Sequence, residues 1–95
     1  MPPLSHYTYG RNAEYRAKRE LEADGWTVIR SSGSHGPHDI LAFKADQPVR
    51  CIQVKATKSE ATASRLIRQF TPTNHGHYRT ELWVWYNRAW SKKVI

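Results

Sequence analysis

Apolar residues recur every four positions near the start of the chain, at Ala13, Ala17 and Leu21. This spacing places them on one face of a helix, so we expect a helix over residues 12–24. Asn12 is a suitable N-terminal cap, and Gly25 is a suitable stop after the last turn. Residues 1–9 show no such period, and we expect them to be irregular.

A second helix is expected over residues 62–70. Its apolar residues follow the i, i+3, i+4, i+7 spacing of a buried stripe, at Ala63, Leu66, Ile67 and Phe70. Pro72 follows closely and ends the helix.

Alternating, β-branched and aromatic stretches predict five strands, over residues 26–30, 38–44, 49–56, 81–86 and 89–95. Serine, glycine and proline predict a loop at 31–37, and residues 45–48 suit a hairpin turn. The resulting order is αβββαββ. It predicts a single α/β domain over residues 1–95, with a mixed central sheet flanked by helices.

Polar side chains gather on one face of the third expected strand. Successive strand residues point to opposite faces, so Cys51, Gln53 and Lys55 share a side. Asp39 starts the neighbouring strand and can join them there. The opposite face of the third strand is apolar, with Ile52, Val54 and Ala56.

Glu14 is a second carboxylate that can reach this point. It borders the apolar face of the first helix, where an unpaired charge is costly to bury. Lys18, one turn along the helix, is one candidate partner. A bound cation is the other.

The chain is strongly basic for its length. Lys and Arg number 15 and Asp and Glu number 8 in 95 residues, which gives a formal net charge of +7. This charge favours a polyanionic partner, and a solvated basic surface is the alternative. The single cysteine excludes an internal disulfide and a zinc site built from several cysteines. It suits an intracellular setting, either cytoplasmic or DNA-associated. No apolar run reaches the roughly 18 residues of a membrane span, and no secretory signal pattern opens the sequence.

Two carboxylates, an amide oxygen and a lysine suit chemistry on a phosphodiester. Magnesium prefers such oxygen ligands, and manganese is expected to substitute for it. Asp39 would be the central ligand, with Glu14 as the second. The Gln53 amide oxygen and the Val54 backbone carbonyl would complete the protein's share, and Lys55 would stabilise charge at phosphorus. The alternative is an ordinary cross-strand cluster of polar side chains.

Several basic residues are candidate phosphate contacts: Arg11, Arg16, Lys18, Arg19, Arg30, Lys58, Arg65 and Arg68. Each is also consistent with a solvated surface charge. Ser32 and His35, in the expected loop, are further candidates for contact with DNA.

The last two expected strands carry large aromatic residues, namely Trp83, Trp85, Tyr86 and Trp90. They could form a base-stacking platform, but their place on strands favours the core or a dimer interface. Two histidine pairs, His35 with His38 and His75 with His77, lack cysteine partners, which disfavours a zinc site.

Four stretches in order resemble the archaeal-type Holliday junction resolvases of the PD-(D/E)XK nuclease superfamily. They are residues 9–14 (YGRNAE), 25–34 (GWTVIRSSGS), 38–42 (HDILA) and 51–58 (CIQVKATK). The resemblance implies a restriction-endonuclease-like fold. It also implies a small homodimeric, magnesium-dependent endonuclease that cuts two opposed strands of a four-way DNA junction.

The resemblance also implies roles for individual residues. Three residues match the family's metal ligands, namely Glu14, Asp39 and Gln53. The family's catalytic lysine is matched by Lys55. A serine in the glycine–serine loop matters in this family, and Ser34 is the best match, ahead of Ser32.

Gln53 departs from the family pattern, which usually has glutamate at this position. The amide keeps an oxygen ligand but removes one negative charge, so cation affinity should fall. Family members also continue past the last strand, whereas this sequence stops at Ile95. Two other interpretations stay open: a nickase or restriction-like nuclease with the same core, and a non-catalytic DNA-binding module of this fold.

Overall fold

A computed structural model describes residues 6–30 and 39–94, with side chains from residue 10 onward. Its elements are α1 (His6–Ala23), β1 (Thr27–Arg30), β2 (Ile40–Phe43), β3 (Val49–Ala56), α2 (Glu60–Gln69), β4 (Tyr78–Tyr86) and β5 (Ala89–Lys93). The predicted order αβββαββ is confirmed.

A single five-stranded sheet forms the centre of the protein, with its strands in the order β1-β2-β3-β4-β5. β3 and β4 run parallel, and the other neighbouring strands are antiparallel. α2 lies in the crossover between the two parallel strands, which cannot be joined by a tight hairpin. The expected mixed sheet is therefore confirmed.

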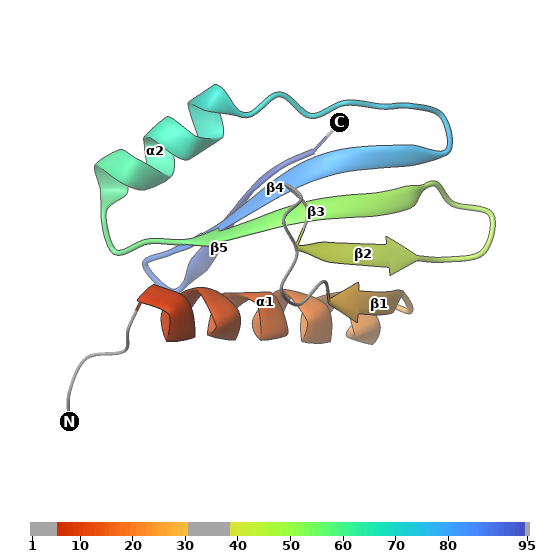
Figure 1. Ribbon diagram of the computed structural model, residues 1–95, viewed down its shortest axis with the longest axis horizontal. Helices are drawn as coiled ribbons and strands as arrows, with labels where there is room; N and C mark the ends of the chain where they lie inside the picture. Colours follow the sequence, from red (N-terminus) through yellow and green to blue (C-terminus); the bar gives the residue numbers. More distant parts are fainter. Residues whose placement is uncertain (1–5, 31–38, 95) are drawn as a thin grey trace.

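The two helices cover opposite faces of the sheet (Figure 1). The core under α1 consists of Ala13, Ala17, Leu21, Ile40, Ala42, Ile52, Val54 and Trp83. The smaller core under α2 consists of Ala63, Leu82 and Val84, with Leu66, Ile67, Phe70 and Tyr86 packed against it. Both apolar helix faces predicted from the sequence are thus confirmed. Neither helix in the described part of the chain is long and apolar enough to cross a membrane.

α1 begins earlier than the apolar pattern predicted. It starts at His6, so the expectation of an irregular segment is wrong for residues 6–9, and Asn12 lies inside the helix instead of capping it. Gly10 does not stop the helix, because one glycine inside a helix costs only about 1 kcal/mol. Residues 6–11 also contain no proline, so nothing in this stretch prevents helix formation.

The predicted stop of α1 at Gly25 is confirmed. The Gly25 N–H donates to the Glu22 carbonyl at 3.0 Å, and the Trp26 N–H donates to the Leu21 carbonyl at 3.0 Å. Gly25 has a φ of 90°, in the left-handed region that residues with a Cβ avoid. These two bonds close the last turn of α1 and lead the chain into β1.

Other boundaries differ by a few residues. α2 starts at Glu60 because Ser59 caps it, with the Ser59 hydroxyl accepting from the Thr62 N–H at 3.2 Å. β4 starts at Tyr78, three residues before the predicted strand, where it pairs with Val49 at the start of β3. The first residues of β4 are polar and exposed, so their strand structure depends on the neighbouring strand and not on a local apolar pattern.

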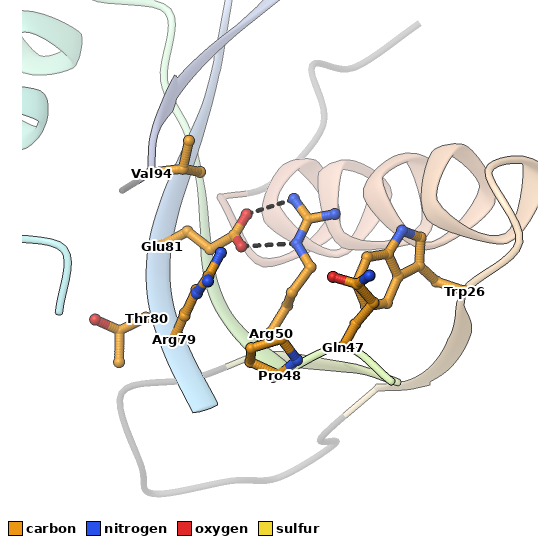
Figure 2. A pocket seen from close by; sticks show the side chains of 8 residues that line it. All are labelled: Trp26, Gln47, Pro48, Arg50, Arg79, Thr80, Glu81 and Val94. Atoms are coloured by element: carbon orange, nitrogen blue, oxygen red, sulfur yellow. Dashed lines mark hydrogen bonds and ion pairs between the residues drawn. The ribbon is translucent and has the colours of Figure 1, made fainter. Parts of the chain in front are cut away.

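A buried carboxylate joins β3 to β4 on the α1 face of the sheet (Figure 2). Glu81 is only 4% exposed. Its two oxygens accept hydrogen bonds from Nε and Nη2 of Arg50, each at 2.7 Å, and Oε1 also accepts from the Trp83 indole at 2.9 Å. The Arg50 guanidinium lies 4.9 Å from the centre of the Trp26 ring. This cluster links the second residue of β3 to the fourth residue of β4, its parallel neighbour.

Candidate active site

Asp39 lies immediately before β2, at the end of its pairing with β3. Its backbone N–H donates to the Ile52 carbonyl at 2.9 Å, and its Oδ2 accepts from the Val54 N–H at 2.8 Å. The register of β2 on β3 ends with Ile40 opposite Ile52. The Asp39 carboxylate therefore accepts the hydrogen bond of the Val54 N–H, which a backbone carbonyl accepts in a regular strand pair. This bond fixes the orientation of the Asp39 side chain at the edge of the strand.

Val54 presents its carbonyl to the same edge of β3. In a strand, the N–H and C=O of one residue point toward the same neighbouring strand, and the Val54 N–H points to Asp39. The second Asp39 oxygen has no hydrogen-bond partner among the described residues. A carboxylate oxygen and a backbone carbonyl are thus available together at this edge.

Glu14 brings the second carboxylate from α1. Burial raises its pKa above the ordinary value of 4.5, and the nearby negative charge of Asp39 raises it further. Three cations act in the opposite direction, namely Arg30, Arg11 and Lys55. Within the described ranges Glu14 makes no ion pair. Two carboxylates that repel each other would be stabilised by a divalent cation bound between them.

Gln53 and Lys55 lie on the face of β3 that α2 covers. They line a shallow depression together with Leu66, Gln69, Phe70 and Leu82. The predicted shared face of these two side chains is present, whereas Glu14 approaches from the α1 face. The Asp39 carboxylate lies at the strand edge between the two. The Lys55 charge nevertheless acts on Glu14 and lowers its pKa.

The structure thus brings Asp39 and Val54 together at one edge of β3, with Glu14 on the α1 side and Gln53 and Lys55 on the α2 side. No group of three or more His, Cys, Asp and Glu side chains suited to a metal occurs within residues 6–30 and 39–94. Two carboxylates, Glu14 and Asp39, lie near this edge, and position 53 carries glutamine. The donors that remain are all oxygens, which fits a hard dication that keeps several waters.

Some expected site residues lie outside the described residues, namely Ser32, Ser34, His35 and His38. The second expected histidine pair, His75 and His77, is exposed and lies just before β4. His75 Nε2 is 3.0 Å from the Thr73 hydroxyl, and its ring stacks on Tyr78 with 4.5 Å between ring centres. These contacts give His75 a structural role in the turn before β4.

The expected phosphate contacts are divided between the two faces of the sheet. Those on the α1 side are Arg11, Arg16, Lys18, Arg19 and Arg30, and those on the α2 side are Lys58, Arg65 and Arg68. Arg11 and Arg30 lie near enough to lower the pKa of Glu14. Lys18, considered as a partner for Glu14, instead pairs with Glu22 at 3.4 Å.

Tyr15 is a member of this site that the sequence did not indicate. It lies between Arg11 and Arg30, with its hydroxyl and its ring both in contact with them. Tyr15 is exposed and does not belong to the apolar face of α1. The apolar spacing along the helix therefore did not indicate a role for it. Its spacing of four residues from Arg11 was the available signal.

The tryptophans belong mainly to the core under α1, as the sequence favoured. Trp83 is 1% exposed, and the Trp90 ring meets Trp83 and Trp85 edge-on at 5.3 and 5.0 Å between centres. Arg16 lies over the half-buried Trp85 ring, 4.3 Å from its centre. Tyr86 packs on the α2 side. These contacts give the aromatic residues a packing role.

Comparisons with known proteins bear on the fold. No family model matches the chain, and no curated protein matches it. Among solved structures, the chain is similar to Archaeoglobus fulgidus Hjc, a Holliday junction resolvase from an archaeal hyperthermophile. The TM-score is 0.60 at 22% sequence identity, over 87% of this chain and 70% of that chain. The chain is therefore a single small α/β domain with the restriction-endonuclease-like fold of Hjc, and its described residues form a five-stranded mixed sheet and two helices.

Proposed function

We propose that the protein is a divalent-cation-dependent DNA endonuclease that cuts four-way junctions. The observation that carries the proposal is the pair of carboxylates, Glu14 and Asp39, which repel each other and lie within range of the Lys55 charge, with Asp39 fixed on β3. The fold of a solved junction resolvase supports it. The net charge of +7 supports a nucleic-acid substrate.

Each residue at the edge of β3 has a defined part in phosphodiester hydrolysis. Asp39 and Glu14 would hold Mg²⁺ or Mn²⁺, with the Val54 carbonyl and the Gln53 amide oxygen as further ligands. The bound ion supplies Lewis-acid polarisation of the phosphate and a more acidic water. As the water oxygen bonds to phosphorus and the bond to the leaving sugar oxygen breaks, negative charge grows on the phosphate oxygens. Lys55 stabilises that charge.

The test is cleavage of labelled four-way, flap and linear DNA, each with and without Mg²⁺. We expect magnesium-dependent cuts that favour the four-way junction. Asp39→Asn should abolish cutting while DNA binding stays within about twofold, because it removes an anionic ligand and no positive charge. Lys55→Ala should also stop cutting. Cleavage by Asp39→Asn at the normal rate would contradict the site assignment.

Paired resolution also requires a homodimer, which is part of the proposal. Two symmetric cuts need two equivalent sites, and a two-fold dimer matches the symmetry of a four-way junction. Sedimentation at micromolar concentration, with and without junction DNA, measures this directly. A monomer in both states would instead favour a nickase with the same core.

A non-catalytic DNA-binding module is the second candidate, and Gln53 is the observation that favours it. Loss of one negative charge lowers the affinity of the site for a cation. Tight, specific junction binding with no cleavage in Mg²⁺ or Mn²⁺ would identify this case.

A further inference from the structure

The two-residue turn between β4 and β5 carries an arginine where its backbone favours glycine. Asn87 has a φ of 53° and Arg88 a φ of 61°, both in the left-handed region. Turns of this kind between antiparallel strands are most often Asn-Gly, because glycine adopts a positive φ without steric cost. Asparagine tolerates the left-handed region, whereas arginine adopts it rarely. Arginine in place of glycine at position 88 therefore costs stability.

The Arg88 side chain has no partner in the described part of the chain. It is exposed, and its guanidinium makes no hydrogen bond or ion pair within residues 6–30 and 39–94. The turn projects beyond the last pair between β3 and β4, which joins Ala56 to Trp85 (Figure 1). A strained residue whose side chain adds no such contact to the fold is a candidate for contact with a ligand.

A hollow opens beside this turn. Its volume is about 430 Å³, and its lining consists of Thr57, Lys58, Trp85, Tyr86, Asn87 and Arg88. The Thr57 N–H donates to the Trp85 carbonyl at 3.0 Å, which holds the end of β3 against β4. Thr57 follows Lys55 by two residues, which is about 7 Å along an extended chain. The hollow therefore begins close to the candidate active site.

The lining of the hollow suits one nucleotide of a DNA strand. Proteins that bind single-stranded nucleic acid combine cations along the backbone with aromatic side chains that contact the bases. The cations here are Lys58 and Arg88, and half-buried aromatic surface comes from Trp85 and Tyr86. The Asn87 amide is able to donate to and accept from a base edge. A paired base is held in the stack by the duplex, whereas an unpaired base at a branch point is free to enter.

We propose that this hollow binds an unpaired nucleotide of branched DNA beside the phosphate that is cut, and that Arg88 binds the phosphate of that nucleotide. The proposal rests on the proposed function, since it names a feature of the substrate. It adds a preference, because a junction with an unpaired nucleotide at the branch point is bound more tightly than a fully paired one.

The experiment is a binding titration in EDTA with two four-way junctions, one fully paired and one with a single unpaired nucleotide at the branch point. The wild-type protein should bind the second junction about tenfold more tightly, the gain expected for one base on an aromatic surface. Arg88→Gly should weaken binding of the second junction about fivefold more than binding of the first. Its slope of log K against log salt should fall by about 0.7, the value for one single-strand phosphate.

Stability separates a ligand contact from a structural role. Glycine relieves the positive φ, so Arg88→Gly should raise the melting temperature by about 2–6 °C while it weakens binding. Asp46 has a φ of 63° in the turn between β2 and β3, so Asp46→Gly is the control for relief of strain without loss of a cation. Arg79→Ala, at the start of β4 and away from the hairpin turn, is the control for one positive charge.

Neither control should change the preference between the two junctions. Equal affinity of the wild-type protein for both junctions would overturn the proposal, as would an equal loss of preference in Arg79→Ala. A lower melting temperature of Arg88→Gly, with binding of both junctions weakened alike, would give Arg88 a structural role and also overturn it.

Binding in EDTA involves no cleavage, so this outcome is separable from that of the proposed function. If the protein never cuts DNA but Arg88→Gly loses the preference, the nucleotide site stands and the nuclease proposal fails. If the protein cuts four-way junctions but binds the two junctions equally, the reverse holds.

Discussion

The buried Arg50–Glu81 pair should be essential for the stability of the domain, and Arg50→Met tests this. The Glu81 side chain is 5% exposed and the Arg50 side chain 22% exposed. Arg50 supplies two of the three hydrogen bonds to the carboxylate, and Trp83 supplies the third. Methionine keeps an apolar stem beside Trp26 but leaves Glu81 as a buried charge with a single donor.

Breaking a buried ion pair from one side costs about 3–5 kcal/mol. Water reaches the partly exposed Arg50 side chain, and solvent screening weakens an ion pair, so we expect about 2–4 kcal/mol here. A domain of 95 residues has a free energy of unfolding of about 5–14 kcal/mol. The variant should therefore lose a large share of its stability, and its melting temperature should fall by roughly 10–30 °C.

Urea unfolding measures this loss, and Lys18→Met is the matched control. Lys18 pairs with Glu22 at 3.4 Å on the helix surface, where the two side chains are 33% and 46% exposed. Its removal should cost less than about 0.5 kcal/mol. A loss in Arg50→Met that is no larger than the loss in Lys18→Met would refute the reasoning.

Further measurements address the site and the DNA contacts. Replacing Arg65 and Arg68 together by alanine should reduce the salt slope of DNA binding by up to about 2, and an unchanged slope would place α2 outside the interface. Gln53→Glu should lower the Mg²⁺ concentration for half-maximal cleavage by about tenfold, because ligand charge sets cation affinity; a magnesium titration checks this. The pKa of Glu14 is raised in the folded protein, so its ionisation costs stability at neutral pH. Without a cation, Glu14→Gln should therefore raise the melting temperature at pH 7, and this gain should disappear as the pH falls and the wild-type carboxyl takes up its proton.

The order of elements could be predicted from the sequence because the apolar patterns are strong. Ala13, Ala17 and Leu21 are at most 2% exposed, as their spacing required. The β3 strand was predicted with its observed bounds, Val49–Ala56, since turn-forming residues precede it and its alternation is clear. Local signals of this kind are sufficient where packing and propensity agree.

Boundaries set by distant partners could not be predicted in this way. Tyr78 and Arg79 are exposed and polar in context, and they form a strand because β3 provides parallel partners at Val49 and Arg50. The start of α1 was also predicted too late, but for a local reason. Asn12 is a good cap in isolation, but nothing before it prevents the helix from continuing.

The placement of the site residues on two faces of the sheet could be learned only from the structure. The sequence indicated Asp39, Gln53 and Lys55 as neighbours, but it could not show that Gln53 and Lys55 face α2 while Glu14 approaches from α1. That arrangement depends on which helix covers which face of the sheet. A local periodic pattern contains no information on this choice.

Asp39 has a structural role as well as its proposed catalytic one, and this determines which variant is informative. Its Oδ2 accepts the Val54 N–H at 2.8 Å. Asp39→Ala would leave that backbone donor without its acceptor, at a cost of about 1–3 kcal/mol, so lost cleavage could reflect a distorted strand edge. Asp39→Asn has an oxygen in the same position and can keep the bond, while the negative charge is removed. Cleavage that disappears in Asp39→Asn at an unchanged melting temperature would therefore show that the charge at this edge, and not the geometry of β3, is what the reaction requires.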